Sequence, residues 1–381
     1  MTLSHKQIDT VGGVLMIAAM WSALILSNTT DWYYEFISSP IKLSSVFFHL
    51  EQSLESIVKD ILMVIFFSYI GMELRYEFHE GSLSDKRQVL LPLVAAIGGM
   101  VVPAVFYLLI NISYPENYPG FAVPCATDIA FAICLFNLIG GALPTSIKVF
   151  LLSIAIFDDL GAIIIIAIFY SSDFNLLWVW ISLPLLACFW IFNRKKITTT
   201  YLYILVGTLL CIGFHNAGLH TTLAGFLTGF FIPLTKKTAT PYLKELMYKL
   251  HPWVQFIILP LFAFTSSGVD FSNDRDIDFF NPIFLGVACG LFLGKQLGVT
   301  LFSYITIKLR WASLPPNSKF THVYIISVFC GIGFTMSLFV GLLAFPDSAT
   351  QSLAKIGVIV GSLSSVVLAI LLNTIRKIRI F

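Results

Sequence analysis

The sequence predicts an all-α membrane protein with about twelve transmembrane helices. Of its 381 residues, 57% are hydrophobic and only 12% are charged, which is about half the charged fraction of an average soluble domain. Apolar segments close to the ~20 residues that a helix needs to cross a bilayer recur along the whole chain. These segments lie at roughly 11–27, 57–74, 89–110, 121–140, 148–170, 176–192, 201–215, 221–234, 253–269, 282–306, 323–344 and 352–373.

The distribution of basic residues agrees with this count. If the N-terminus is cytoplasmic, most of the 23 Lys and Arg residues fall on the cytoplasmic side. The loops on the other side hold mainly acids, such as Asp270 and Asp274. Because cytoplasmic loops of membrane proteins are enriched in Lys and Arg, we expect both termini to be cytoplasmic. The longest outside connection, about 28–56, contains PIKLSSVFFHL, which predicts either a short surface hairpin or a plain loop.

Composition and motifs argue against several classes of protein. The net charge of +2 is too small to indicate a nucleic-acid partner. No G-x-x-x-x-G-K-[ST] run is present, so no ATP-binding loop is expected. The six cysteines lie in apolar segments and form no C-x-x-C pair, so we expect neither disulfides nor a zinc site.

Four ionisable residues lie inside the apolar segments: Asp128, Asp158, Asp159 and Lys295. Each would cost roughly 2.5–3.5 kcal/mol near the centre of a membrane helix, so such residues pair, become neutral or line a wet cavity. One interpretation is an ion-pair network that only holds helices together. Three acids and one base leave an acidic excess, however, which a purely structural pair would not need.

The neighbouring Asp158 and Asp159 point about 100° apart on a helix. One of them can therefore meet Lys295 while the other faces a cavity. Two carboxylates this close titrate as a coupled set, so the site can hold a proton and exchange it for a cation. Oxygen ligands without Cys or His favour an alkali cation or a hard divalent cation.

Two of the apolar segments contain helix-breaking residues. In AVPCATDIAFAI, Pro124 is expected to end a helix near Val123, and Thr127 and Asp128 are good N-cap residues for a second half-helix. In VFCGIGFTMSLF, the pair Gly331 and Gly333 predicts a break, although close helix packing through small residues is an alternative. The breaks fall in the middle spans of two triplets, spans 3–5 and 10–12, which start on opposite sides of the membrane. Inverted repeats with paired broken helices predict an ion site at the membrane midplane.

Several longer motifs resemble those of the NhaA-type sodium/proton antiporters of bacteria, a family in which inverted repeats are already known. These motifs extend from about residue 60 to 365 and read PCATDIAFA, IFDDLGAIIIIAIFY, LHTTLAGF, LHPWVQFIILPLFAF, GKQLG and CGIGFTMS. The resemblance implies twelve helices in which the fourth and eleventh are unwound and cross each other. It also implies exchange of Na+ or Li+ for protons, electrogenic and pH-regulated, for pH and sodium homeostasis. No cofactor and no enzymatic activity are implied.

The resemblance also assigns roles to individual residues. Asp158 and Asp159 become the transport aspartates, and together with Thr127 they become the ligands of Na+ or Li+. Thr127 and Asp128 would lie at the crossing, where Asp128 would compensate the half-helix ends. Lys295 becomes the membrane lysine of the tenth span. Our hypothesis is that Asp159 is the main cation ligand, while Asp158 alternates between Lys295 and the cation.

Two further residues, His220 and Glu73, match positions that are linked to pH response or to the cytoplasmic funnel in this family, and Glu245 is a third candidate for the pH response. The alternatives are an interfacial polar residue for His220 and a solvated charge for Glu73. Asp60 matches an acid near the outer end of the second span. One departure is that Met247 and Tyr248, in the segment KELMYKLHPW, occupy the positions of a Glu-His pair in the family, while Glu245 lies out of register.

The resemblance further implies a bacterial inner-membrane homodimer that forms through residues of about 40–50. A core bundle would comprise about 89–171 and 282–373, and an interface part about 1–88 and 172–281. Two other functions stay open. A bile-acid-type sodium symporter shares the architecture, and an intramembrane aspartyl protease also needs two membrane aspartates, which Asp128 and Asp159 could supply. The G-x-G-D context of such proteases is absent, since the sequence here reads GIGF.

Overall fold

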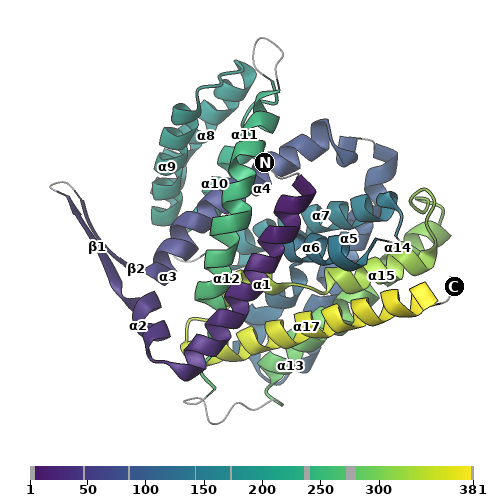
Figure 1. The fold of residues 1–381 in the computed structure, drawn as a ribbon. Coiled ribbons are helices and arrows are strands. Elements are labelled where there is room, and N and C mark those ends of the chain that lie inside the picture. The colour runs from purple at the N-terminus through teal and green to yellow at the C-terminus, as the bar shows by residue number, and fades with distance from the viewer. Residues whose placement is uncertain are drawn as a thin grey trace. The chain divides into compact units, whose positions relative to one another are not determined.

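The computed structural model describes residues 5–45, 48–84, 86–141, 143–171, 174–235, 241–271 and 280–378. The described chain is almost entirely helical (Figure 1) and divides into two compact units. The first unit comprises Met1–Tyr33, Asp85–Ala162 and Ser266–Phe381, and the second comprises Tyr34–Ser84 and Ile163–Thr265. The predicted functional division into core and interface parts stays a prediction.

The first unit is built from long helices and two interrupted ones. Its elements are α1 (His5–Thr29), α5 (Lys86–Ile110), the 3₁₀ helix η3 (Pro115–Cys125), α6 (Ile129–Ile139), most of α7 (Thr145–Phe169), α13 (Pro282–Cys289), the π-helical turn η5 (Gly290–Gly294), α14 (Lys295–Lys308), α15 (Phe320–Cys330), α16 (Phe334–Ala344) and α17 (Ser348–Ile378).

The second unit contains the remaining helices and one β-hairpin. Its elements are most of α2 (Trp32–Ser38), β1 (Pro40–Ser45), β2 (Phe48–Ser53), α3 (Leu54–Ile57), η1 (Val58–Leu62), α4 (Met63–His79), η2 (Ser82–Ser84), α8 (Leu176–Arg194), α9 (Thr200–Asn216), α10 (Thr221–Phe230), α11 (Tyr242–Trp253), η4 (Val254–Ile258) and most of α12 (Leu259–Ser267). The strands pair antiparallel, with Pro40 opposite Ser53 and Ser45 opposite Phe48. Of the two predictions for this connection, the hairpin is therefore confirmed; Val46 and Phe47 lie outside the described residues.

The helix lengths support a polytopic membrane protein. Among the described residues, seven helices are long and apolar enough to cross a membrane, or nine spans if each of two bent pairs counts as one. Two further apolar helices, α9 and α10, are shorter. The all-helical membrane class is thus confirmed in its coarse form, whereas twelve spans and helix crossing stay predictions.

Both predicted helix breaks are present. The pair η3 and α6 is bent by 44°, and the pair α15 and α16 by 46°. Asp128 is the N-cap of α6, because its carboxylate accepts the Phe131 N–H. The prediction that the first half ends near Val123 is wrong in detail, since η3 continues to Cys125 as a 3₁₀ helix. Three prolines within this segment, Pro115, Pro119 and Pro124, lack the N–H donor that an α-helix would use.

The segment before HPW is also different from the expectation. The predicted spans at 221–234 and 253–269 place KELMYKLHPW in the loop between them, but it forms the helix α11, which continues through η4 into α12. Residues 242–267 thus form one span candidate of 26 residues. Pro252 is tolerated there because a π-helical turn follows directly, and such turns re-accommodate the interrupted backbone pairing.

Glycines bring the helices of the first unit into direct backbone contact. A Cβ on Gly298 of α14 would lie 2.1 Å from the Gly98 carbonyl oxygen of α5. A Cβ on Gly99 would lie 3.9 Å from Lys295 Nζ, so the lysine side chain runs along this contact. Close approach through small residues is typical of membrane helices, and here it places Lys295 against α5.

A buried hydrogen-bond network fixes the first half, η3, of the broken span formed by η3 and α6. Tyr107 donates to the Asn117 carbonyl (2.9 Å), and Asn117 Nδ2 donates to Asn111 Oδ1 (2.9 Å). Asn111 Nδ2 in turn donates to the Pro282 carbonyl at the start of α13 (2.9 Å). Because buried polar groups that are fully paired specify one arrangement, this network sets where η3 lies relative to α5 and α13.

The start of α17 provides a pH-dependent contribution to stability. Asp347 accepts the Thr350 N–H (2.9 Å) and the Thr350 hydroxyl. These hydrogen bonds lower the pKa of Asp347 below its ordinary value, and the one from the hydroxyl has the larger effect. The stabilisation is therefore present above the unfolded-state pKa of about 3.9 and is lost as the pH falls through the lower folded-state value.

We expect Asp347→Ala to lower the free energy of unfolding at neutral pH by about 0.5–2 kcal/mol, as for the loss of other N-caps. The difference from the wild type should shrink as the pH falls below about 4. Asp347→Asn is the matched control, because asparagine also caps helices but does not titrate in this range. Thermal unfolding in detergent at pH 7 and at about pH 2, well below the unfolded-state pKa, measures both effects. An equal loss at both pH values would contradict the role of the carboxylate.

Candidate functional site

The five residues predicted from the apolar segments lie together in the first unit. Asp158 and Asp159 lie in the middle of α7, Lys295 is the first residue of α14, and Thr127 and Asp128 lie in the gap between η3 and α6. Each is at most 1% exposed. Sites of this kind, with ionisable side chains deep in a membrane bundle, are expected to be functional.

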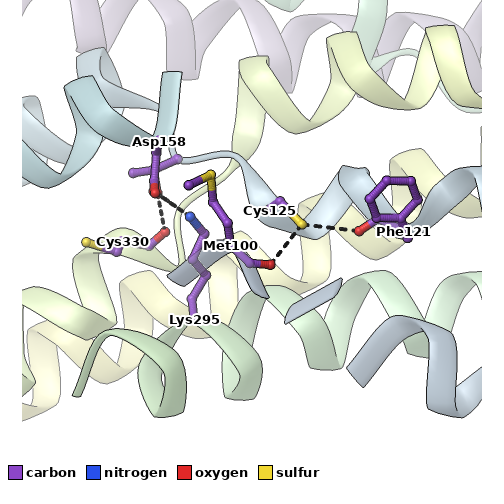
Figure 2. Close-up of polar contacts among 7 residues, drawn as sticks. Met100, Phe121, Cys125, Asp158, Lys295 and Cys330 are labelled. Atoms are coloured by element: carbon purple, nitrogen blue, oxygen red, sulfur yellow. Dashed lines mark hydrogen bonds and ion pairs between the residues drawn. The ribbon is translucent and has the colours of Figure 1, made fainter. Parts of the chain in front are cut away.

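The centre of the site is an ion pair between α14 and α7. Lys295 Nζ lies 2.5 Å from Asp158 Oδ2, and Figure 2 shows the two side chains facing each other. Thr127 completes a triangle: its hydroxyl lies 2.6 Å from Asp158 Oδ2 and 3.0 Å from Lys295 Nζ. Because the pair is fully buried, each charge depends on the other for stabilisation.

The hydroxyl of Thr127 also connects the site to the second broken span. Its oxygen lies 2.9 Å from the Cys330 carbonyl, at the end of α15. The single hydroxyl proton can therefore go either to Asp158 or to Cys330. A cation that replaced Lys295 at Asp158 would meet a hydroxyl and a backbone carbonyl close by, which are oxygen ligands suited to alkali cations.

The two aspartates have different surroundings, as their angular separation on α7 requires. Asp158 is the partner of Lys295, and its second oxygen, Oδ1, makes no hydrogen bond with the described part of the chain. Asp159, the next residue, is 1% exposed, whereas the ion pair of Lys295 is formed with Asp158. The structure therefore shows which aspartate meets the lysine in this conformation.

Asp128 binds the ends of two half-helices and makes no hydrogen bond or ion pair with Lys295. Its Oδ1 accepts the Phe131 N–H of α6 (2.9 Å), and its Oδ2 accepts both the N–H (3.0 Å) and the hydroxyl (2.5 Å) of Thr335 in α16. Its own N–H donates to the Ile332 carbonyl (2.7 Å). A carboxylate between two positive helix ends is electrostatically favourable.

Sequence reasoning missed Thr335 and the sulfur-bearing residues near the ion pair. Thr335 follows Gly333 by two residues, so the N-cap argument used for the first break would have found it in the second. Cys125 Sγ lies 3.2 Å from the carbonyl oxygens of both Met100 and Phe121, as Figure 2 shows. No simple sequence signal marks this contact, because it depends on how η3 packs against α5.

Comparison with known proteins decides the family. The model of the family described as Na+/H+ antiporter 1 matches residues 4–372. The chain belongs to the Na+/H+ antiporter 1 family.

Curated relatives of this antiporter family match nearly the whole chain. Na+/H+ antiporter NhaA 1 of Klebsiella pneumoniae is 40% identical over 369 residues, which cover 96% of this chain and 93% of the relative. The Na+/H+ antiporters NhaA of Citrobacter koseri and of Escherichia coli strain K12 are each 40% identical over 365 residues, covering 94% of both chains. The resemblance drawn from the motifs is thus confirmed.

The three residues predicted to act in the pH response all lie in the second unit. His220 precedes α10, and its Nε2 lies 2.8 Å from the Tyr170 carbonyl. Burial lowers the pKa of His220, although the hydrogen bond to Tyr170 opposes this shift. Lys59 and Asp60 also act on it electrostatically.

Glu73 and Glu245 lie elsewhere in that unit. Glu73 is 13 positions after Asp60 on the continuous helix η1–α4, which corresponds to about 20 Å along the axis. Glu73 is half-buried, while Glu245 is exposed on α11. The structure therefore does not bring His220 and Glu73 together into one cluster.

The departure at Met247 and Tyr248 has a structural counterpart. Met247 packs against the apolar core of the second unit. Lys244 Nζ lies 5.6 Å from the centre of the Tyr248 ring and 5.7 Å from that of Tyr76, which is within the range of cation–π contacts. Where the resemblance implies an acid and a histidine, this segment carries an apolar side chain and an aromatic ring that contacts a lysine.

Proposed function

We propose that this protein expels Na+, and also Li+, from the cell in exchange for protons. Family membership supports antiport of Na+ and H+. The single observation that carries the site assignment is the buried triangle of Lys295, Asp158 and Thr127, next to Asp159. A buried lysine–carboxylate pair that a cation can split is suited to exchange, because cation and proton use the same groups.

In the proposed cycle, Asp159 is the main cation ligand and Asp158 alternates between Lys295 and the cation. Arrival of Na+ draws Asp158 away from Lys295, and protons leave the coupled set of the two aspartates and the lysine. Thr127 adds a hydroxyl ligand. On the other side of the membrane the steps run in reverse, and protons displace Na+.

This competition explains the expected dependence on pH and on voltage. Protons hold the site when the cytoplasm is acidic, so exchange should slow down there. If more than one proton leaves for each Na+ that binds, the cycle moves net charge and is electrogenic. A transmembrane potential would then contribute about 2.3 kcal/mol per charge per 100 mV.

We further propose a topology of twelve spans with both termini in the cytoplasm of a bacterium and the protein in its inner membrane. The two bent pairs would be the fourth and eleventh spans, crossing at the site, within inverted repeats of spans 3–5 and 10–12. The contacts of Asp128 with α6 and α16 support such a crossing. Residues 89–171 and 282–373 would form the transport core.

For regulation and assembly, the proposals rest on the resemblance. His220, Glu73 and Glu245 are proposed to contribute to the pH response, with a midpoint altered by Met247 and Tyr248. The hairpin of β1 and β2 is proposed as the dimer contact at about residues 40–50.

Proton flux into vesicles that contain the purified protein tests the proposed function. We expect added Na+ and Li+, but not K+, to release protons accumulated in the vesicles, with lower rates at acidic pH. Imposing a membrane potential should change the rate if exchange is electrogenic. The absence of proton movement with Na+ at every pH would overturn the proposal. Movement of Na+ together with an organic solute would instead support the symporter alternative.

A further inference from the structure

The N-terminus of α16 is held by a side chain that has no part in the exchange mechanism proposed above. A helix begins with backbone N–H groups that have no partner within the helix. At α16 the Thr335 N–H is bound by Asp128, as described above. The two preceding N–H groups, of Gly333 and Phe334, point instead to Ser362 Oγ of α17, at 3.2 and 3.3 Å.

Ser362 is 4% exposed, and serine side chains pack closely around the break between α15 and α16. A Cβ on Gly331 would lie 2.5 Å from Ser365 Oγ, and a Cβ on Gly333 would lie 2.2 Å from Ser337 Oγ. Serine hydroxyls of two helices therefore pack directly against the glycines of the break. Of these three hydroxyls, that of Ser362 alone bonds to the amides of the break.

The held helix end lies close to the proposed cation site. The Thr127 hydroxyl donates to the Cys330 carbonyl at the start of the break, and it also contacts Asp158 and Lys295 of the site. The N-terminus of a helix carries roughly half a positive charge, so α16 directs positive potential toward the site. Asp128 offsets part of this potential, and the oxygen of Ser362 offsets another part at two N–H groups.

We propose that Ser362 is a positioning residue for cation binding. By accepting the Gly333 and Phe334 N–H groups, it fixes the start of α16 and reduces the positive potential that the bound ion meets. The inference rests on the proposed exchange of Na+ for protons, since it concerns the strength of binding at that same site.

Ser362→Ala removes the acceptor and leaves both N–H groups buried without one. We expect the KM for Na+ at alkaline pH, where protons compete least, to rise by about 2- to 10-fold, the range that corresponds to one hydrogen bond. The kcat should change little. Protons are also cations, so the pH of half-maximal activity on the acid side should move to lower pH. A loss of structure alone would lower the amount of active protein and would produce neither shift.

The same helix supplies a matched control. Ser364 is two residues away and partly buried, and its hydroxyl makes no hydrogen bond within the described residues. Ser364→Ala should leave the KM and the acid midpoint unchanged. Ser362→Cys has nearly the same shape but a weaker acceptor, so it should fall between the wild type and Ser362→Ala and provides a second variant if the alanine variant fails to fold.

The experiment measures proton flux against Na+ concentration and pH in vesicles that hold the full-length protein. Na+-dependent thermal stabilisation of the same protein in detergent provides a binding readout without transport. A rise in KM and a weaker Na+ stabilisation for Ser362→Ala, with Ser364→Ala unchanged, would support the proposal. An unchanged KM, equal effects of the two alanine variants, or a change in kcat alone would overturn it while the wild type still exchanges ions. If the wild type neither exchanges nor binds Na+, the proposed function fails and this inference fails with it.

Discussion

Replacing Asp159 with asparagine is expected to abolish the exchange of Na+ for protons. Asparagine has nearly the same shape as aspartate, so the packing of α7 should persist. It carries no negative charge and cannot release a proton, and the proposed mechanism requires both properties of its main cation ligand. Interactions with charged groups contribute about 1.5–3 kcal/mol, so the rate at limiting Na+ should fall by at least about 10- to 100-fold.

Proton flux in vesicles across a range of Na+ concentrations and pH values measures this effect. Thermal unfolding of the same preparation shows whether the variant is folded. Asp347→Asn is the control, because Asp347 is an exposed aspartate before α17 that lies outside the site. If Asp159→Asn keeps Na+-driven proton movement, then Asp159 is not the main cation ligand.

The composition of the site could be predicted from the sequence because bilayers penalise charge. Asp128, Asp158, Asp159 and Lys295 stand out against apolar segments, and the structure places all four in one unit at 1% exposure or less. The cost of burying an isolated charge means that such residues must find partners. This argument depends on residue type and on position within a span, which a sequence reveals directly.

Helix geometry alone leaves open which aspartate meets Lys295, and from the sequence the pairing with Asp158 is only a hypothesis, because the answer depends on how α7 is rotated. A Cβ on Gly161 would lie 2.2 Å from Met100 Sδ of α5, so this contact helps to set the rotation of α7. Likewise Lys295 follows the π-helical turn η5, which changes the direction of every later side chain in α14. Neither the close contact between α7 and α5 nor the π-helical turn leaves a clear pattern in the sequence.

The broken spans could be located from Pro124, Gly331 and Gly333, but the groups that bind their ends could not. Local chemistry determines where a helix breaks, since proline and glycine act on their own backbone. The partner of each exposed helix end comes from elsewhere in the chain. Asp128 and Thr335 are 207 positions apart, and Ser362 reaches the break from the last helix. Long-range partners of this kind require the three-dimensional arrangement.

Replacing Lys295 with alanine is expected to cause the largest loss of stability of any substitution in the site. Removing one member of a buried ion pair leaves an uncompensated charge and typically costs about 3–5 kcal/mol. Asp158 would then have to bind a proton in place of the ammonium group, and Na+ would have to displace it. Exchange by the remaining folded protein should therefore require a more alkaline pH. Thermal unfolding in detergent and pH-dependent proton flux measure the two effects, and Lys249→Ala, on the exposed surface of α11, provides the control.

A double variant separates a transport role of this pair from a purely structural one. Lys295→Met together with Asp158→Asn removes both charges and keeps similar side-chain volumes, and neutral replacements of whole buried pairs are often tolerated. We expect the double variant to recover most of the stability lost in Lys295→Ala. It should show no exchange at any pH, because the neutral side chain at position 158 can neither release a proton nor offer a charge to Na+. If the recovered protein exchanged ions at the wild-type rate, the pair would only hold α7 and α14 together. The buried charges would then be a structural lock, which is the alternative that the acidic excess in these spans argues against.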